Sequence, residues 1–153
     1  MKIPAQLNSR FLFQMTGELG PSQKFGTKIL APFIGGAITG PKLEGRLIPG
    51  GGDWLSIRPK GICELDVRNT IETGDGALIY MSGNGRRVMH PTVVERLLTF
   101  EDWAALDVLS YYLRLAATFE TGDPRYERLN GIVSVGVGRF TSDGVAFDLH
   151  EIL

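Results

Sequence analysis

Hydrophobic and polar residues alternate with a period of two along most of this 153-residue chain. The alternating segments are short and rich in Val, Ile, Phe, Tyr and Thr, which is typical of β-strands with one buried face. The predicted strands cover residues 10–18, 28–39, 43–48, 55–57, 61–72, 77–82, 109–119, 131–140 and 145–152.

Tight-turn sequences separate these segments. They are Gly20-Pro21, Gly40-Pro41, Pro49-Gly50, Gly74-Asp75-Gly76, Asn84-Gly85 and Asp143-Gly144. Asp-Gly and Asn-Gly are strong hairpin signals, because these residues tolerate the positive φ of two-residue loops. Short strands joined by turns, without interleaved helices, predict an antiparallel sheet that is closed into a barrel or folded as a sandwich.

One helical region interrupts this pattern. Thr99-Phe-Glu-Asp102 has the layout of a capping box and precedes Trp103, Leu106 and Leu109. Pro91 can open an earlier helical turn. Residues 109–119 are also compatible with a continuing helix, but their strict alternation favours a strand. The sequence therefore predicts a mainly β protein with one or two short helices.

Composition and charge place the chain among soluble proteins. Its 153 residues suit one domain, over residues 1–153, and its net charge of −1 gives no basis for binding nucleic acid or an anionic membrane. The first 15 residues lack the features of a signal peptide, and no apolar run reaches the ~20 residues of a membrane span. The single Cys63 fits a reducing compartment, so a cytoplasmic location is expected.

Motifs for metals and cofactors are missing. The chain has two histidines and one cysteine, without the spacing of a zinc site, an EF-hand, a Walker lysine loop or a dinucleotide fingerprint. We expect neither a metal nor a cofactor. The remaining catalytic groups are carboxylates, arginines and tyrosines, which suit proton transfer, enolisation, elimination or cyclisation.

Glycine is concentrated in residues 35–85, which hold 12 of the 20 glycines. Glycine weakens a strand interior and marks bends, bulges or close approaches. Asp53 and Trp54 follow three of these glycines, and Arg58 lies four residues further on. Such a bend can aim a carboxylate and an aromatic ring into a cleft. Alternatively, Asp53 caps a turn and Trp54 fills the core.

The strand at residues 62–73 has one apolar and one charged side. One side carries Cys63, Leu65, Val67, Asn69 and Ile71, and the other carries Glu64, Asp66, Arg68, Thr70 and Glu72. The charged side is either a solvated outer face or the lining of a barrel lumen in which a polar ligand is oriented. Asp66 and Arg68 are close enough to pair or to bind one ligand. Tyr80, Tyr112 and Arg114 are further candidates for ligand binding on the sheet faces.

Five motifs in order resemble a known family. They are residues Phe33 to Gly36, Gly40 to Gly45, Pro49 to Trp54, Leu65 to Arg68 and Thr73 to Ile79. The chain resembles the domain of unknown function 3237 family, also called uncharacterised protein family 0311. This resemblance, which continues through residues 119–130, implies a lipocalin-like (calycin-like) antiparallel barrel of about eight or more strands, and no established reaction.

Carried over from the family, the matching polar positions are Asp53, Arg58, Asp66, Arg68, Thr73 and Asp75, with Trp54 as their aromatic partner. Thr73 and Asp75 are explained by the hairpin turn. Such proteins tend to have an aromatic residue before the Leu-Asn pair, where this chain has Arg128. If that position lines the cavity, the ligand preference changes.

Three functional hypotheses follow. In the first, the protein is a cofactor-independent lyase, isomerase or cyclase for a small oxygenated, aromatic or polyketide-like metabolite. Asp53 or Asp66 is then the general base, Arg58 or Arg68 stabilises an enolate or carboxylate, and Trp54 stacks on the substrate. In the second, the barrel carries a small apolar molecule without catalysis, and Asp66–Arg68 is a structural ion pair. In the third, the glycine-rich segment is the contact of a homo-oligomer.

Overall fold

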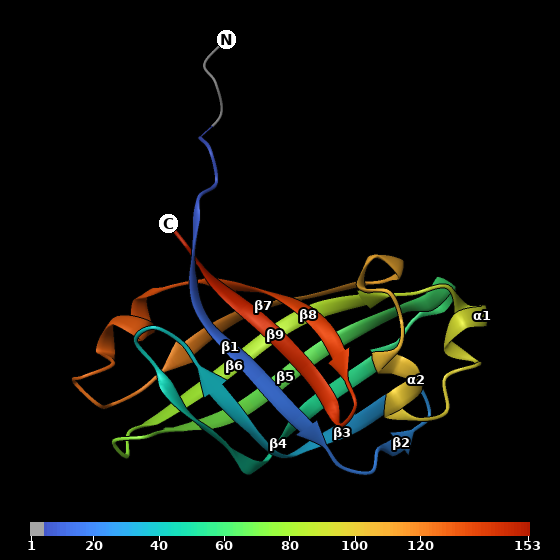
Figure 1. Cartoon of the computed structure of the whole chain (residues 1–153), viewed down its shortest axis with the longest axis horizontal. Coiled ribbons are helices and arrows are strands. Elements are labelled where there is room, and N and C mark those ends of the chain that lie inside the picture. Colours follow the sequence, from blue (N-terminus) through green and yellow to red (C-terminus); the bar gives the residue numbers. More distant parts are fainter. Residues whose placement is uncertain (1–4) are drawn as a thin grey trace.

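The computed structural model describes residues 5–153, which form one nine-stranded antiparallel sheet in the order β1-β9-β8-β7-β6-β5-β4-β3-β2. β1 also pairs with β3, so that eight strands close into a barrel and β2 is attached at its edge (Figure 1). The strands are β1 (Ser9–Leu19), β2 (Gln23–Phe25), β3 (Lys28–Thr39), β4 (Glu44–Ile57), β5 (Ile62–Thr73), β6 (Leu78–Val88), β7 (Tyr112–Glu120), β8 (Ser134–Thr141) and β9 (Gly144–Ile152). The predicted antiparallel barrel is confirmed.

Two short helices lie between β6 and β7, at one end of the barrel (Figure 1). They are α1 (Pro91–Val94) and α2 (Phe100–Ala104). The predicted capping box is present: the Thr99 hydroxyl accepts from the Asp102 N–H (3.2 Å), and the Asp102 carboxylate accepts from the Thr99 N–H (2.9 Å). The ambiguous segment contains a 3₁₀ turn at Val108–Ser110 followed by β7, as the alternation favoured.

The glycine triplet does not separate two strands, as the sequence pattern had suggested. β4 runs continuously from Glu44 to Ile57. Its partners in β5 change from Ile48↔Thr70 to Gly52↔Arg68, so β4 holds two extra residues in a bulge. Gly50 has a φ of +117°, a conformation that side chains other than glycine rarely adopt. The predicted bulge in the glycine-rich segment is therefore observed, but without a turn at Pro49.

Asn84-Gly85 is also not a turn, contrary to the prediction. Both residues pair with β5 inside β6, which extends to Val88. A Cβ atom at Gly85 would lie 2.1 Å from the Arg114 carbonyl oxygen, so close packing against β7 explains this glycine. The turn at Gly74-Asp75-Gly76, by contrast, joins β5 to β6 as expected, with Gly76 at a φ of +88°. β2 was not predicted.

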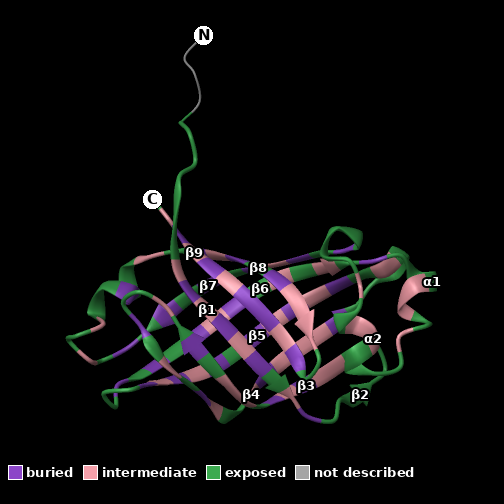
Figure 2. Cartoon of the chain, in the orientation of Figure 1, coloured by how far each residue is buried: buried purple, intermediate pink, exposed green. Residues whose placement is uncertain are grey.

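Alternation between buried and exposed residues follows the strands around the barrel (Figure 2). Large inward-facing side chains fill most of the interior, and the fully buried ones include Phe13, Met15, Ile38, Leu47, Ile71, Ile79, Met81, Leu115 and Leu149. On β5 every second side chain from Cys63 to Ile71 is buried, while Glu64, Asp66 and Arg68 between them face outward. The charged side of this strand is thus the outer face, and the hypothesis that it lines the lumen is wrong.

The two ends of the barrel differ. α2 and β2 lie at one end, and the β5–β6 turn and the 3₁₀ helix at Glu127–Gly131 lie at the other (Figure 1). No helix formed by residues 5–153 has the length and the apolar composition needed to cross a membrane.

Candidate functional site

The barrel interior is not filled at the α2 end. A cavity of about 220 Å³ remains there, and most of its wall is apolar. The apolar wall comprises Leu19, Ile29, Ala31, Phe33, Leu55, Leu65, Val67, Phe100, Trp103, Leu113, Phe140, Val145 and Phe147. Three charged or ionisable groups interrupt it, namely Lys24, Asp53 and Arg87, together with Ser22. This cavity is the candidate functional site.

Asp53 lies on the inward face of β4, just after the bulge, and lines the cavity. Successive residues of a strand point to opposite faces, so that Asp53 and Leu55 line the cavity while Trp54 does not. One carboxyl oxygen of Asp53 accepts a hydrogen bond of 2.9 Å from the Asp66 N–H. Asp53 is thereby held against β5 and faces an apolar space.

Burial changes the acidity of this group. Desolvation raises the pKa of Asp53 from 3.8 to about 7, and the negative charge of Asp66 acts in the same direction. The hydrogen bond from the Asp66 N–H and the positive charge of Arg87 lower the pKa but do not offset burial. Near pH 7 the Asp53 carboxyl can therefore accept or donate a proton, as a general acid or base must.

Arg87 is the second charged group inside the barrel. It lies on β6 opposite Cys63 of β5 and Leu113 of β7, both of which face the core. Its Nε atom is buried and has no hydrogen-bond partner among residues 5–153. Its guanidinium carbon lies 5.0 Å from the centre of the Trp103 ring, in the geometry of a cation–π contact. Arg87 is therefore held by Trp103 and retains an unused donor.

The α2 helix covers the same end of the barrel. It brings Phe100 and Trp103 to the cavity wall. Trp103 packs on Phe140 of β8 at 4.7 Å between ring centres, and Phe140 packs on Tyr111 at 5.0 Å. The Phe140 N–H also donates to the Tyr111 hydroxyl at 3.2 Å. This aromatic cluster fixes α2 to the barrel beside the cavity.

Most of the other predicted site residues lie outside the cavity. Trp54 and Asp66 border a separate polar depression of about 290 Å³, which is also lined by Lys28, Ser56, Glu64, Leu65, Asn84 and Arg86. Arg68 lies on the outer face and pairs with Asp66 at 3.5 Å. Arg58 is exposed and pairs with Glu64 at 3.1 Å. The structure therefore brings Trp54 and Asp66 together, but not with the side chain of Asp53 in the cavity.

Tyr80, Tyr112 and Arg114 are on the outer face of β6 and β7. Tyr80 and Tyr112 are exposed, and the Arg114 guanidinium lies 4.8 Å from the centre of the Tyr112 ring. Arg128 does not line the cavity either. It forms an ion pair with the buried Glu151, which Arg10 also contacts at 2.9 Å. The Arg128 position therefore gives no reason to expect an altered cavity.

Sequence reasoning missed Arg87 and Trp103 as site residues. The predicted strand ended at residue 82, because Asn84-Gly85 was interpreted as a turn. Extended by the same alternation, the strand places Arg87 on the side of Ile79 and Met81, which face the core. A charged residue at an inward position was the available signal. For Trp103, the helix was predicted, but nothing in the sequence indicated where it would pack.

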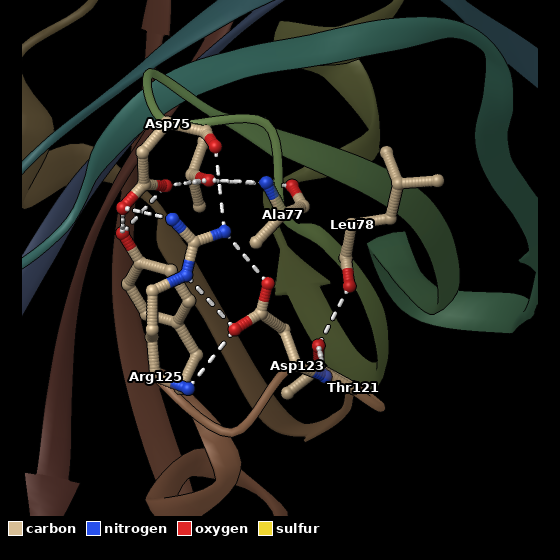
Figure 3. A network of polar contacts seen from close by, with 8 residues as sticks. Asp75, Ala77, Leu78, Thr121, Asp123 and Arg125 are labelled. Atoms are coloured by element: carbon tan, nitrogen blue, oxygen red, sulfur yellow. Dashed lines mark hydrogen bonds and ion pairs between the residues drawn. The ribbon is translucent and has the colours of Figure 1, made fainter.

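A polar network lies at the opposite end of the barrel (Figure 3). The Tyr126 hydroxyl donates to the Asp75 carboxylate at 2.9 Å, and Arg125 pairs with Asp75 at 3.1 Å and with Asp123 at 2.7 Å. Thr121 donates to the Leu78 carbonyl at 2.7 Å. These bonds connect the β5–β6 turn to the segment after β7. Asp75 thus has a larger structural role than the hairpin alone indicated.

Metal ligands do not gather at either end. Within residues 5–153, no group of three or more His, Cys, Asp and Glu side chains is arranged so that it could hold a metal ion.

Comparisons with known proteins agree with the resemblance seen in the motifs. The model of the family described as "Protein of unknown function (DUF3237)" matches residues 7–152. A UPF0311 protein of Clostridium acetobutylicum is 37% identical over 134 residues, which cover 88% of this chain and 83% of that protein. The crystal structure of a conserved protein of unknown function from Rhodopseudomonas palustris is 28% identical, covers 99% of this chain and 100% of its own, and has a TM-score of 0.89.

A more distant structure, described as an enzyme from Penicillium herquei, is 23% identical with a TM-score of 0.71 and covers 100% of this chain and 99% of its own. This likeness concerns the fold alone. The family model and the C. acetobutylicum relative establish that this chain belongs to the DUF3237 family.

Proposed function

We propose that the cavity binds a small, mainly apolar, oxygenated molecule and that Asp53 exchanges a proton with it. The protein would then be a cofactor-independent lyase, isomerase or cyclase. The observation that carries this proposal is a carboxyl group with a pKa of about 7 in an apolar cavity of about 220 Å³. Perturbed carboxyl groups in such cavities are typical of catalytic acids and bases.

Each group has a role in this proposal. The Asp53 carboxylate removes a proton from a carbon next to a carbonyl, and the electron pair moves to the carbonyl oxygen as an enolate. Arg87 stabilises the enolate charge. The protonated Asp53 then returns its proton to another carbon, which gives isomerisation. Alternatively, the enolate re-forms the carbonyl and breaks the bond to a leaving group on the β carbon, and that group departs with the proton from Asp53, which gives elimination. Arg87, and not Arg58 or Arg68 as the sequence suggested, is the arginine that stabilises the enolate in this proposal, because Arg58 and Arg68 lie outside the cavity.

The apolar wall also supports a second function, that of a carrier that binds without catalysis. The Penicillium herquei protein of similar fold is called an enzyme, but at 23% identity it informs only on the fold. The distinction between the two functions therefore rests on whether Asp53 moves a proton.

Proton exchange can be measured directly. We expect the protein to accelerate the exchange of the C1 and C3 protons of 2-tetralone in D₂O, followed by ¹H NMR at pH 7. Asp53→Asn should abolish the acceleration, whereas Glu72→Gln, on the outer face of β5 and paired with Arg46, should retain it. Native mass spectrometry checks whether 2-tetralone or a co-purified molecule is bound. Binding without any acceleration by the wild-type protein would favour the carrier.

A further inference from the structure

The charges around the cavity are unbalanced. Arg87 lies inside it, and the exposed Lys24 of β2 contributes to its wall. Among residues 5–153, neither makes an ion pair. Asp53 is the single acidic residue of the described wall. Two cations thus face one carboxyl group that burial favours in its neutral form.

Arg87 has a donor without an acceptor. This buried Nε–H has lost its hydration without compensation. The Arg87 side chain also lines the cavity, so an acceptor bound in the cavity can supply the counter-charge that the guanidinium lacks among residues 5–153. Trp103 occupies one face of the guanidinium, and hydrogen bonds form along its edge. A carboxylate presents two oxygens in the plane that matches this edge, and its bonds to a guanidinium are about twice as strong as neutral ones.

The size of the cavity limits the apolar part of such a ligand. A cavity of about 150 Å³ holds one benzene molecule, and this one measures about 220 Å³. One ring with a short side chain therefore fills the space. The aromatic and aliphatic wall provides contacts for that ring, including those with Phe33, Phe100 and Phe147.

We propose that this cavity selects a monocarboxylate with an apolar body of about one ring, whose carboxylate binds Arg87. Lys24 raises the local concentration of such anions at the cavity. The groups that face the bound carboxylate are Arg87 on β6, Lys24 on β2 and Asp53 on β4, and Asp53 is compatible with it when protonated. This inference rests on the proposed binding role of the cavity and names its ligand class.

The test compares two molecules of the same shape. Trans-cinnamate and trans-cinnamamide differ in charge but not in the ring or the chain. Isothermal titration calorimetry with the full chain at pH 6 and low salt should give a Kd for cinnamate at least about tenfold lower than that for cinnamamide. Arg87→Gln should bring the two Kd values together by weakening cinnamate alone. Arg86→Gln, one residue away and on the outer face, should leave both unchanged.

The outcomes separate this inference from the proposal beneath it. Equal Kd values for the two molecules in the wild-type protein would overturn the selection of an anion and leave binding in the cavity intact. Binding of neither molecule up to 5 mM would overturn both. If Arg87→Gln does not fold, the salt dependence of the wild-type protein decides, because only cinnamate binding should weaken as NaCl rises. Cinnamate binding that is insensitive to NaCl would overturn the inference.

Discussion

A single backbone hydrogen bond links Asp53 to the residue whose side chain it was expected to resemble in function, Asp66. The Asp66 N–H donates to Asp53, yet the two side chains lie on opposite sides of the barrel wall. Asp53 faces the apolar cavity, and Asp66 borders a polar depression with 38% of its side chain exposed. The same residue type therefore has different surroundings at the two positions, and burial raises the pKa of Asp53 to about 7.

Replacing Asp53 should stabilise the protein in a pH-dependent way. Its pKa is about 7 in the folded state against 3.8 for an unperturbed aspartate, so between these pH values the folded state binds a proton that the unfolded state does not. Wild-type stability contributed by this group is present below pH 4 and is lost as pH rises to about 7. A difference of one pKa unit corresponds to about 1.4 kcal/mol. The free energy of unfolding of Asp53→Asn, relative to that of the wild type, should therefore rise by roughly 2–4 kcal/mol from pH 4 to pH 8.

Urea denaturation of both proteins at pH 4, 6 and 8 measures this gain. A constant difference in the free energy of unfolding across the three pH values would contradict a buried, titrating Asp53.

The Asp66–Arg68 pair should contribute little to stability. The two side chains are 38% and 58% exposed, and their closest atoms are 3.5 Å apart. Exposed pairs of this kind contribute about 0–1 kcal/mol, because solvent screens their attraction. Asp66→Asn and Arg68→Ala should each lower the free energy of unfolding by less than about 1 kcal/mol, by urea denaturation at pH 7. Unfolding or aggregation of either variant would instead make the pair a structural requirement of the barrel.

At the level of elements, strand alternation predicted most of the barrel but not its interruptions. A period of two depends on local burial, and the sequence therefore located strands such as β1, β3, β5 and β9. In the sequence, Gly50 and Gly85 look the same as glycines in turns. In the structure, Gly50 lies in a bulge and Gly85 allows two strands to pack closely. These roles depend on the neighbouring strands, which a single sequence does not show.

A single sequence also does not show which residues from other elements surround Asp53. The glycine triplet points to Asp53, but the partners that the sequence suggests for it, Trp54 and Arg58, are near it only along the chain. Arg87 comes from β6, which is separated from β4 by β5 in the sheet, and Trp103 comes from α2; both line the same cavity as Asp53, although they are distant from it in sequence.

Gly85 and Gly74 should respond differently to the same substitution. A Cβ atom at Gly85 would lie 2.1 Å from the Arg114 carbonyl oxygen, whereas one at Gly74 would meet nothing within 4 Å. Gly85→Ala should therefore force β6 and β7 apart and lower the free energy of unfolding by about 1–3 kcal/mol. Gly74→Ala is the matched control and should be neutral or slightly stabilising. Equal effects in thermal denaturation would mean that both glycines serve as turns.

The whole molecule is a barrel with two different ends. One end keeps a cavity beneath α2, and the other is tied together by Asp75, Arg125 and Tyr126 (Figures 1 and 3). The hydroxyls of Thr73 and Tyr126 lower the pKa of Asp75, and Arg125 adds to this effect. Asp75 therefore stabilises the folded state at neutral pH, and this stabilisation is lost in acid, as the pH falls through the lowered pKa of Asp75. The pH dependence is opposite in sign to that of Asp53.

Because the cavity and the polar network lie at different ends of the barrel, we expect that stability and ligand binding can be changed separately. Tyr126→Phe removes the hydroxyl that donates to Asp75 and keeps the ring, so the urea midpoint at pH 7 should fall. Its Kd for cinnamate should remain within about twofold of the wild type, since distant sites contribute independently. Trp103→Ala, at the other end, should weaken cinnamate binding, because Arg87 loses the ring that holds it. A Tyr126→Phe variant that is folded yet fails to bind would show that the polar network shapes the cavity across the length of the barrel.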